Sequence, residues 1–542
     1  MDKLKILEFF NREYDGPKRT IIFMSAVRAV FTALMVAVVN QSAEFIAKNN
    51  SVEIHFVFLY ITVCATIIYS LYYSTTQVTI MSVKLVRKMR VRLTDKLRRT
   101  ELEFLETSGQ GRIYARIAQD TDLVQHGTPE ALIFIDAALT CIFLLIYVAF
   151  ISPTGVVFIL CFFFFYYGAF LLNYVKIREK LNAAREKEAA FFDLLNDTLT
   201  GFKEIKINTR KNNELFADIN KLSRETEQLK KEGGFKNNQN IAIAYSSSIG
   251  LLGVVVFAVP IFTDAQSETV VKLVALVMFL FGLINSMSRG FPFIMRLNAA
   301  VENMEKLEAD IDAFGISPSP EETIIPKSFQ KIVLKSVSFT YASKEGDTLF
   351  SLNPVNLTIR QGDILFVVGG NGSGKTTLLK LLTGLYYPAA DGRIILDDQT
   401  VTLENYQSYR ELFSVIFTDF HMFRKLYGVE SVGEQEVKDL LRKMDIHKKT
   451  DYVDGKFTNT DLSTGQRKRL AYIAAILEDK PIYVFDEWAA DQDPLFRRYF
   501  YEKFLQDLRA MNKTVIAISH DDNFFDKADR VITMEEGKMR IG

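Results

Sequence analysis

The stretch Ile364–Leu379, which reads ILFVVGGNGSGKTTLL, decides what kind of domain the second half of the chain forms. An apolar run meets a glycine-rich loop, and a helix-like run follows it. Gly369, four further residues and then Gly374, Lys375 and Thr376 match the phosphate-loop pattern without a mismatch. A chance match in a glycine turn is the alternative, but the strand before the loop and the helix after it favour a phosphate site. The stretch therefore predicts binding of a nucleoside triphosphate.

Two further segments downstream of this loop carry chemistry. Pro481–Glu487, PIYVFDE, reads as an apolar strand that ends in two carboxylates, of which one can hold Mg²⁺ and the next can polarise a water molecule. This pattern is weak alone and strong with a phosphate loop upstream. Leu462–Arg467, LSTGQR, precedes a helical run, and its Ser and Gly backbone suits a second anion site or an ordinary helix N-cap.

The composition separates the chain into two different halves. Of its 542 residues 49% are hydrophobic and 44 are Phe, and the long apolar runs lie in the first 300 residues. The 65 basic and 65 acidic residues cancel, which gives no electrostatic case for a nucleic-acid partner. The three cysteines lie within apolar runs, which favours buried thiols over a disulfide framework or a thiolate metal site.

Six stretches of the first half are long enough to cross a bilayer, which needs about 20 mostly apolar residues. Buried helices of a soluble protein are the alternative, but such helices rarely run this long without a polar face. The predicted spans are Thr20–Val39, Ile54–Tyr73, Ala131–Ile151, Gly155–Val175, Ile241–Phe262 and Val270–Ile294.

The basic residues between the spans predict the orientation. Cations cluster before the first span and after the second, where a basic run begins at Lys84, whereas the short connections after the first, third and fifth spans carry few. Because cytoplasmic loops carry the excess of Lys and Arg, both termini and the two long connections should face the cytoplasm. A break in each long connection, at Thr107–Arg112 and at Thr200–Ile207, is consistent with a short transverse helix that touches a cytoplasmic domain or with a bare turn.

Ionisable residues inside the predicted spans are costly and often functional. Arg28 lies in the first span and Asp136 in the third. They either face a shared water-filled cavity and pair across it, or snorkel or form a structural ion pair. Arg289 belongs to a polar stripe of the sixth span that could line a pathway.

The motifs VGGNGSGKTT, LSTGQ, YVFDE and ISHD, in this order and spacing, resemble the nucleotide-binding domain of ABC transporters. The resemblance covers the whole chain, because six spans ahead of one such domain are typical of exporter half-transporters. More narrowly, the run from Gly465 to Tyr501 and SVIFTDFHMF are similar to bacterial cyclic-peptide and siderophore-peptide exporters. The implied fold is a membrane α-helical bundle fused to an α/β P-loop ATPase domain, with residues 1–315 as the transmembrane domain, 316–331 as a linker and 332–542 as the nucleotide-binding domain.

The resemblance implies a role for each motif residue, with ATP and Mg²⁺ as cofactors. Glu487 would be the catalytic base and His520 the switch histidine, whereas Thr376 and Asp486 would hold the metal. The loop at 490–493 would communicate across a dimer. The residues expected to bind ATP are Tyr341, which would stack on adenine, Gly369, Gly370, Asn371, Gly372, Ser373, Gly374, Lys375, Thr376 and Thr377 around the phosphates, and Ser463, Gly465 and Gln466 in the signature motif.

The chain departs from the family pattern in two places. Thr464 stands where the signature motif usually has a second glycine, and Thr418 stands at the position of the family's loop glutamine. Whether Thr418 or Asp419 substitutes for that glutamine is open, and with it the degree of coupling between hydrolysis and transport. The segment between this loop and the signature is short, which suggests a reduced helical subdomain.

A signature motif is expected to complete the phosphate loop of another chain, so the resemblance implies a homodimer with twelve spans, with a related partner chain as the alternative. The expected function is ATP-driven export of a peptide-like substrate across the bacterial inner membrane, by a multi-pass protein that contacts membrane lipid. A lipid flippase of the same architecture and a membrane-tethered regulatory ATPase that moves no solute are the alternatives.

Overall fold

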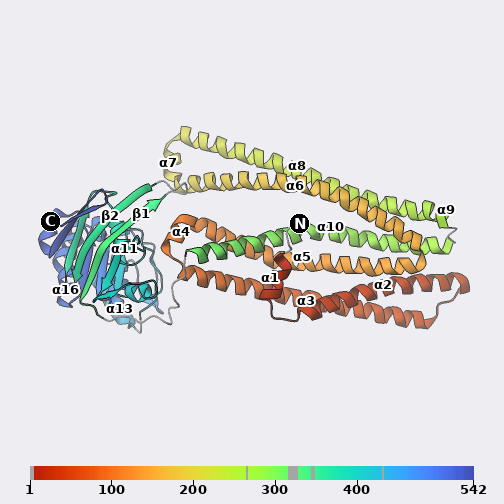
Figure 1. Cartoon of the computed structure of the whole chain (residues 1–542), viewed down its shortest axis with the longest axis horizontal. Helices are drawn as coiled ribbons and strands as arrows, with labels where there is room; N and C mark the ends of the chain where they lie inside the picture. The colour runs from red at the N-terminus through yellow and green to blue at the C-terminus, as the bar shows by residue number, and fades with distance from the viewer. Residues whose placement is uncertain (1–4, 264–266, 315–327, 343–347, 430–431, 542) are drawn as a thin grey trace. The chain divides into compact units, whose positions relative to one another are not determined.

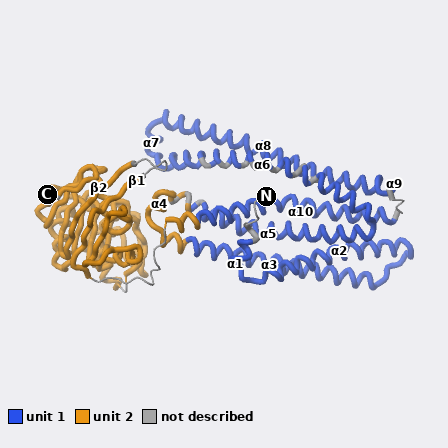
Figure 2. Tube along the Cα trace, viewed as in Figure 1, with its two compact units in different colours: residues 1–93, 114–307 blue, residues 94–113, 308–542 orange. Residues whose placement is uncertain are grey.

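The computed structural model describes residues 5–263, 267–314, 328–342, 348–429 and 432–541, and the chain forms two compact units (Figure 2). Unit 1 comprises Met1–Leu93 and Tyr114–Leu307, and unit 2 comprises Thr94–Ile113 and Glu308–Gly542. Unit 2 therefore includes a short segment from the first half of the chain. Most of the predicted linker, 316–331, lies outside the described residues.

Long helices dominate the first half of the chain (Figure 1). Helices cover all six predicted spans, and five helices in the described residues are long and apolar enough to cross a membrane. The fourth predicted span lies in α6, whose described apolar part, Pro153–Phe165, is shorter. The helices are α1 (Lys5–Glu13), α2 (Lys18–Asn49), α3 (Ile54–Arg99), α4 (Leu102–Ser108), α5 (Gln110–Ile151), α6 (Pro153–Thr200), α7 (Phe202–Ile207), α8 (Thr209–Gly253), η1 (Val254–Ala258), α9 (Val259–Thr263) and α10 (Ser267–Ala313).

The helices of unit 1 expose large apolar side chains over much of their surface. On α3, for example, Phe58 is 64% exposed, Ile68 66% and Tyr72 70%. Contiguous apolar surface of this extent is unfavourable in water and favourable against lipid acyl chains. The chain is accordingly a multi-pass membrane protein.

Both predicted breaks in the long connections coincide with short helices. α4 ends at Ser108, where Gly109 adopts φ +78°, and α7 follows Gly201. α6 and α8 pack against each other along much of their length, and α7 joins them at one end (Figure 1). The two breaks therefore lie at the ends of helical hairpins.

Unit 2 contains a six-stranded sheet with the order β12-β11-β3-β10-β9-β6, in which only β12 pairs antiparallel, and a four-stranded antiparallel sheet with the order β2-β1-β4-β5. Helices cover the parallel strands, as is usual for an α/β domain. The strands are β1 (Lys331–Ala342), β2 (Thr348–Arg360), β3 (Ile364–Gly369), β4 (Arg393–Leu396), β5 (Gln399–Thr400), β6 (Phe413–Ile416), β7 (Tyr452–Val453), β8 (Lys456–Phe457), β9 (Ile482–Asp486), β10 (Thr514–Ile518), β11 (Arg530–Glu535) and β12 (Lys538–Ile541).

The helices of the second half are short. Between residues 419 and 463 the described residues contain a single α-helix, α13, as expected for a reduced helical subdomain. The helices and helical turns are α11 (Lys375–Leu382), α12 (Tyr406–Arg410), α13 (Glu434–Lys443), α14 (Thr464–Leu477), η3 (Trp488–Asp491), α15 (Pro494–Tyr499), η4 (Phe500–Phe504), α16 (Leu505–Ala510) and η5 (Asp522–Lys527).

The register of the parallel strands brings three motifs to one edge of the sheet. Ile518 at the end of β10 pairs with Val367 of β3 on one side and with Asp486 of β9 on the other. Because these strands are parallel, the loops that follow them leave the sheet at the same edge. The phosphate loop, the two acids and His520 therefore converge.

Candidate nucleotide site and membrane unit

The phosphate loop requires glycine at its two ends. Gly369 adopts φ +147° and Gly374 φ +99°, conformations that residues with a side chain rarely adopt. A Cβ at Gly369 would lie 2.3 Å from the carbonyl oxygen of Met534, and one at Gly374 would lie 2.9 Å from the ring of Phe350. The sequence therefore has no alternative residue at either position without a backbone shift.

The polar groups inside the loop fit a bound phosphate chain. The Lys375 ammonium is buried and donates to the carbonyl oxygens of Gly369 at 2.8 Å and of Gly370 at 3.0 Å. Ser373 Oγ is buried without a hydrogen-bond partner among the described residues. The first N–H groups of α11 also have no partner within the helix. Phosphate oxygens would satisfy these donors.

Thr376 and Asp486, the two predicted metal residues, lie side by side. Thr376 Oγ1 donates to Asp486 Oδ2 at 3.4 Å. Burial raises the pKa of Asp486, hydrogen bonds from Thr418 lower it, and the charge of Glu487 raises it. One hydroxyl and one carboxylate suit Mg²⁺, which takes few protein ligands when phosphate oxygens and water complete its shell.

Thr418 contacts the metal acid, whereas its neighbour does not do so in the described contacts. Thr418 Oγ1 donates to the backbone oxygen of Asp486 at 3.3 Å, and Asp419 is exposed. Of the two alternatives for the missing glutamine, Thr418 is thus the residue that reaches the site.

Glu487 and His520, the predicted catalytic pair, are in contact. His520 Nε2 lies 3.2 Å from Glu487 Oε1, and both side chains are partly exposed. Glu487 has a left-handed backbone with φ +51° at the junction between β9 and the helical turn η3. Both groups can act on a water molecule at the sheet edge.

The predicted signature residues form an exposed helix N-terminus. Ser463 caps α14 in a reciprocal capping box with Gln466, and Ser463 and Thr464 are exposed. The ordinary N-cap is therefore present. It is compatible with an anion site, because the helix end stays open to a ligand.

Two residues connect the signature turn to Glu487 and the loop after it: Gln492, which belongs to the predicted loop at 490–493, and Lys468, which the sequence did not point to. Gln492 donates to the carbonyl oxygen of Gly465 at 3.1 Å and accepts from Arg469. Lys468 is 1% exposed, and its ammonium donates to the carbonyl oxygen of Glu487 at 2.6 Å and pairs with Asp491 at 2.7 Å. No sequence signal points to the bond of Lys468, because its partner is a backbone oxygen.

Tyr341, the predicted adenine-stacking residue, belongs to an aromatic cluster at the end of β1. Its ring lies 5.0 Å from that of Phe339, 5.8 Å from that of Tyr386 and 6.4 Å from that of Phe350. Phe350 borders the phosphate loop at Gly374. The cluster therefore connects Tyr341 to the loop.

In the membrane unit Arg28 and Asp136 form a buried ion pair, with side chains 12% and 9% exposed. Pairing is thus present, but neither residue lines either of the two cavities described below.

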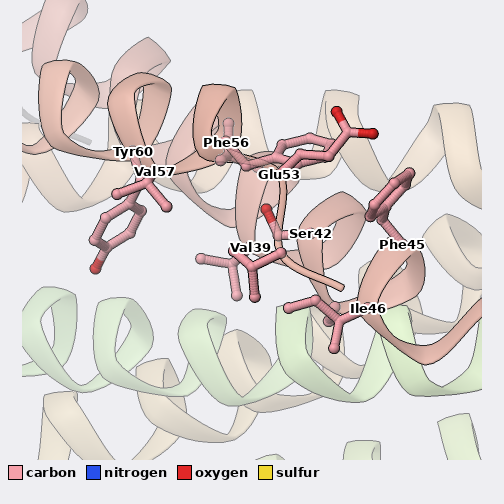
Figure 3. Close-up of a pocket in the computed structure, with 11 residues that line it drawn as sticks. Val39, Ser42, Phe45, Ile46, Glu53, Phe56, Val57 and Tyr60 are labelled. Atoms are coloured by element: carbon pink, nitrogen blue, oxygen red, sulfur yellow. The ribbon is translucent and has the colours of Figure 1, made fainter. Parts of the chain in front are cut away.

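Two mainly apolar cavities lie among the described residues of unit 1. The first, of about 370 Å³, lies between α2 and α3 (Figure 3), and its lining residues are Val38, Val39, Ser42, Ala43, Phe45, Ile46, Val52, Glu53, Phe56, Val57 and Tyr60. The second, of about 300 Å³, lies between α5, α6, α8 and α10, and its lining includes Cys141, Phe162, Ser247, Leu280 and Met287. Arg289, which belongs to the predicted polar stripe, does not line the second cavity.

Known proteins support this combination of units. Residues 20–287 match the family described as the ABC transporter transmembrane region, and residues 352–490 match the family described as ABC transporter. The chain is 30% identical to the ATP-binding protein SyrD of Pseudomonas syringae pv. syringae over 84% of this chain and 82% of SyrD. It is 24% identical to the ATP-dependent lipid A-core flippase of Francisella novicida over 84% of this chain and 78% of the flippase.

The fold and the site define a membrane-spanning helical region fused to a P-loop ATPase domain. The chain belongs to the ABC transporter family, as an exporter-type member that couples ATP hydrolysis to transport.

Proposed function

We propose that this transporter exports a peptide-like substrate across the bacterial inner membrane by alternating access as a homodimer. The convergence of the phosphate loop, Asp486, Glu487 and His520 at one sheet edge carries the ATP-driven part of the proposal. The basic connections support a cytoplasmic position for both termini.

The residues of the site have different roles in ATP hydrolysis. Lys375, Ser373 and the loop backbone hold the phosphates, and Tyr341 stacks on adenine. Glu487 orients and polarises the attacking water, with His520 positioned against it at 3.2 Å. Thr376 and Asp486 hold Mg²⁺, which when bound neutralises charge on the outer phosphates.

Two features support a second copy of the chain as partner. The signature turn presents an exposed helix N-terminus, and its described hydrogen bonds join it to the residues after β9 rather than to the phosphate loop. The tip formed by α7 and its flanking helix ends exposes apolar residues, with Leu199 69%, Phe202 56% and Ile207 88% exposed. Such a tip requires a covering surface in the assembled protein.

The substrate class rests on the similarity of the ATPase sequence to cyclic-peptide and siderophore-peptide exporters. A lipid flippase is the second candidate, because several of the relatives are ATP-dependent lipid A-core flippases. The apolar cavities of unit 1 are compatible with apolar side chains and with acyl chains.

Reconstitution separates the two candidates. We expect inverted proteoliposomes to accumulate a labelled cyclic peptide when Mg-ATP is added, and Glu487→Gln to bind Mg-ATP and abolish uptake, with hydrolysis reduced about 10²- to 10⁴-fold. Movement of a fluorescent lipid without peptide uptake would favour the flippase. Unchanged hydrolysis in Glu487→Gln would refute its catalytic assignment.

A further inference from the structure

Unit 2 holds α4 through two acidic residues that contact separate parts of the ATPase fold. Glu106, in α4, pairs with Lys380 of α11 at 2.7 Å, and Glu101, directly before α4, pairs with Arg410 of α12 at 2.7 Å. Each acid also accepts a hydrogen bond from a tyrosine hydroxyl, Glu106 from Tyr386 and Glu101 from Tyr387. Charge-assisted hydrogen bonds of this type are stronger than neutral ones.

The contact with Tyr386 leads directly to the predicted nucleobase position. Tyr386 is 2% exposed, and its hydroxyl accepts from Tyr341 at 3.2 Å and from Lys380 at 3.3 Å while it donates to Glu106. Burial raises the pKa of Tyr386, so the phenol stays neutral and keeps the proton that it donates. The hydrogen bonds thus run in one direction from Tyr341 through Tyr386 to the carboxylate of Glu106.

The ring of Tyr386 is held firmly in place. It stacks on Phe339 with centroids 4.5 Å apart, and the Lys380 ammonium lies 4.9 Å from its centroid. A change in the orientation of Tyr341 therefore changes the hydrogen bond at Tyr386 before it moves the ring. Tyr387 offers a comparison, since its described hydroxyl bonds go to Glu101 and Arg410.

We propose that Tyr386 and Glu106 are positioning residues that couple occupation of the nucleobase position at Tyr341 to the docking of α4. The inference rests on the proposed stacking of adenine on Tyr341. When the base fixes the Tyr341 ring, the hydroxyl chain to Glu106 becomes better ordered and α4 is held more tightly. By thermodynamic linkage, a docked α4 strengthens binding of the base by the same factor.

This route is separate from the contact of Thr418 with Asp486, which senses the metal and phosphate end of the nucleotide. The Tyr386 route senses the base. It therefore predicts that a ligand with phosphates and no base leaves α4 unchanged.

Hydrogen–deuterium exchange of the amides of residues 102–113 tests this on the full chain in lipid nanodiscs, with Glu487→Gln added to prevent hydrolysis. We expect saturating Mg-ATP to slow this exchange by about fivefold, the equivalent of one hydrogen bond of ~1 kcal/mol. Mg-tripolyphosphate, at a concentration that displaces Mg-ATP, should leave the exchange as in the ligand-free protein.

Two variants break the route and one serves as a matched control. Tyr386→Phe removes only the hydroxyl, and Glu106→Ala removes a side chain that is 40% exposed, so that folding is preserved. Both should abolish the ATP-dependent slowing. Tyr387→Phe deletes the equivalent hydroxyl, which bonds to Glu101, and should retain the ATP-dependent slowing of exchange.

The possible failures are distinguishable. An equal effect of tripolyphosphate and ATP, or full ATP-dependent slowing in Tyr386→Phe and Glu106→Ala, would overturn the proposed coupling. A Tyr341→Ala variant that binds Mg-ATP with unchanged affinity would instead overturn the stacking role on which the coupling rests.

Discussion

At the scale of single residues, Asp486 is the group whose protonation should limit the site. Burial raises its pKa, and the neighbouring Glu487 charge raises it further against the hydrogen bonds of Thr418 and Thr376. An acid with a raised pKa keeps its proton to a higher pH, and the protonated form does not bind Mg²⁺. We therefore expect the Mg²⁺ concentration needed for half-maximal ATP binding to rise about tenfold per pH unit below that pKa.

Comparison of the parent protein with a Thr418→Val variant isolates the protonation of Asp486. The protonation of ATP itself contributes equally to both titrations and therefore cancels. Loss of the Thr418 hydroxyl removes a contribution that lowers the pKa of Asp486. The rise in Mg²⁺ requirement should then begin at a higher pH than in the parent protein. Filter binding of labelled ATP at several pH values, in the Glu487→Gln background, measures this, and superimposable curves would contradict the assignment of Asp486.

The residue contacts that could be predicted from the sequence are those that follow from strand order. Thr376 meets Asp486 and His520 meets Glu487 because parallel strands end at one edge. The position of Lys468 could not be predicted, because its bond to the carbonyl oxygen of Glu487 depends on backbone geometry and not on the type of residue 487. The same holds for Gln492, which binds the carbonyl oxygen of Gly465.

At the scale of secondary-structure elements, the start of α14 is packed against η3 so closely that only glycine fits. A Cβ at Gly465 would lie 2.5 Å from the carbonyl oxygen of Asp491. Gly465→Ala must therefore displace η3, which also carries the ion pair between Asp491 and Lys468. We expect hydrolysis to fall by about 10- to 10²-fold while ATP binding at the phosphate loop changes little, since a misplacement of about 1 Å suffices for such a loss.

Gly433→Ala provides the control, because Gly433 caps a different helix and a Cβ there meets nothing within 4 Å. ATPase rates and nucleotide affinities of both variants, measured in parallel, make the comparison. A normal rate in Gly465→Ala would show that η3 can move without consequence for catalysis.

The long helices were predictable because a run of apolar side chains determines both helix length and burial in lipid. Helices cover the six predicted spans, and α4 and α7 lie at the two predicted breaks. Contact of α4 with the ATPase domain is one of the two alternatives that the break allows, but its partners could not be predicted, because the contact of Glu101 with Arg410 joins residues 309 positions apart. Local periodicity contains no information on such a contact.

At the scale of the whole molecule, the open helix end at Ser463 and the phosphate loop at Lys375 should act in different chains. Each chain offers one of each, so a symmetric dimer would contain two composite sites. A chain with a defective phosphate loop and a chain with a defective signature then complement each other, because their mixed dimer keeps one site with both parts intact. A site built within a single chain would not allow this.

We therefore expect Lys375→Ala and Ser463→Arg, each inactive in Mg-ATP occlusion, to regain it when the two chains are co-expressed. Random pairing makes about half of the dimers mixed, each with one intact site of two, so about a quarter of the normal occlusion should return. Glu487→Gln in both chains makes trapped ATP the readout and removes any need for turnover at two sites. Doubly tagged dimers, isolated through one tag on each chain, should raise the value to about half. Occlusion that stays absent in doubly tagged dimers would mean that each chain uses its own signature, and the composite site would be wrong.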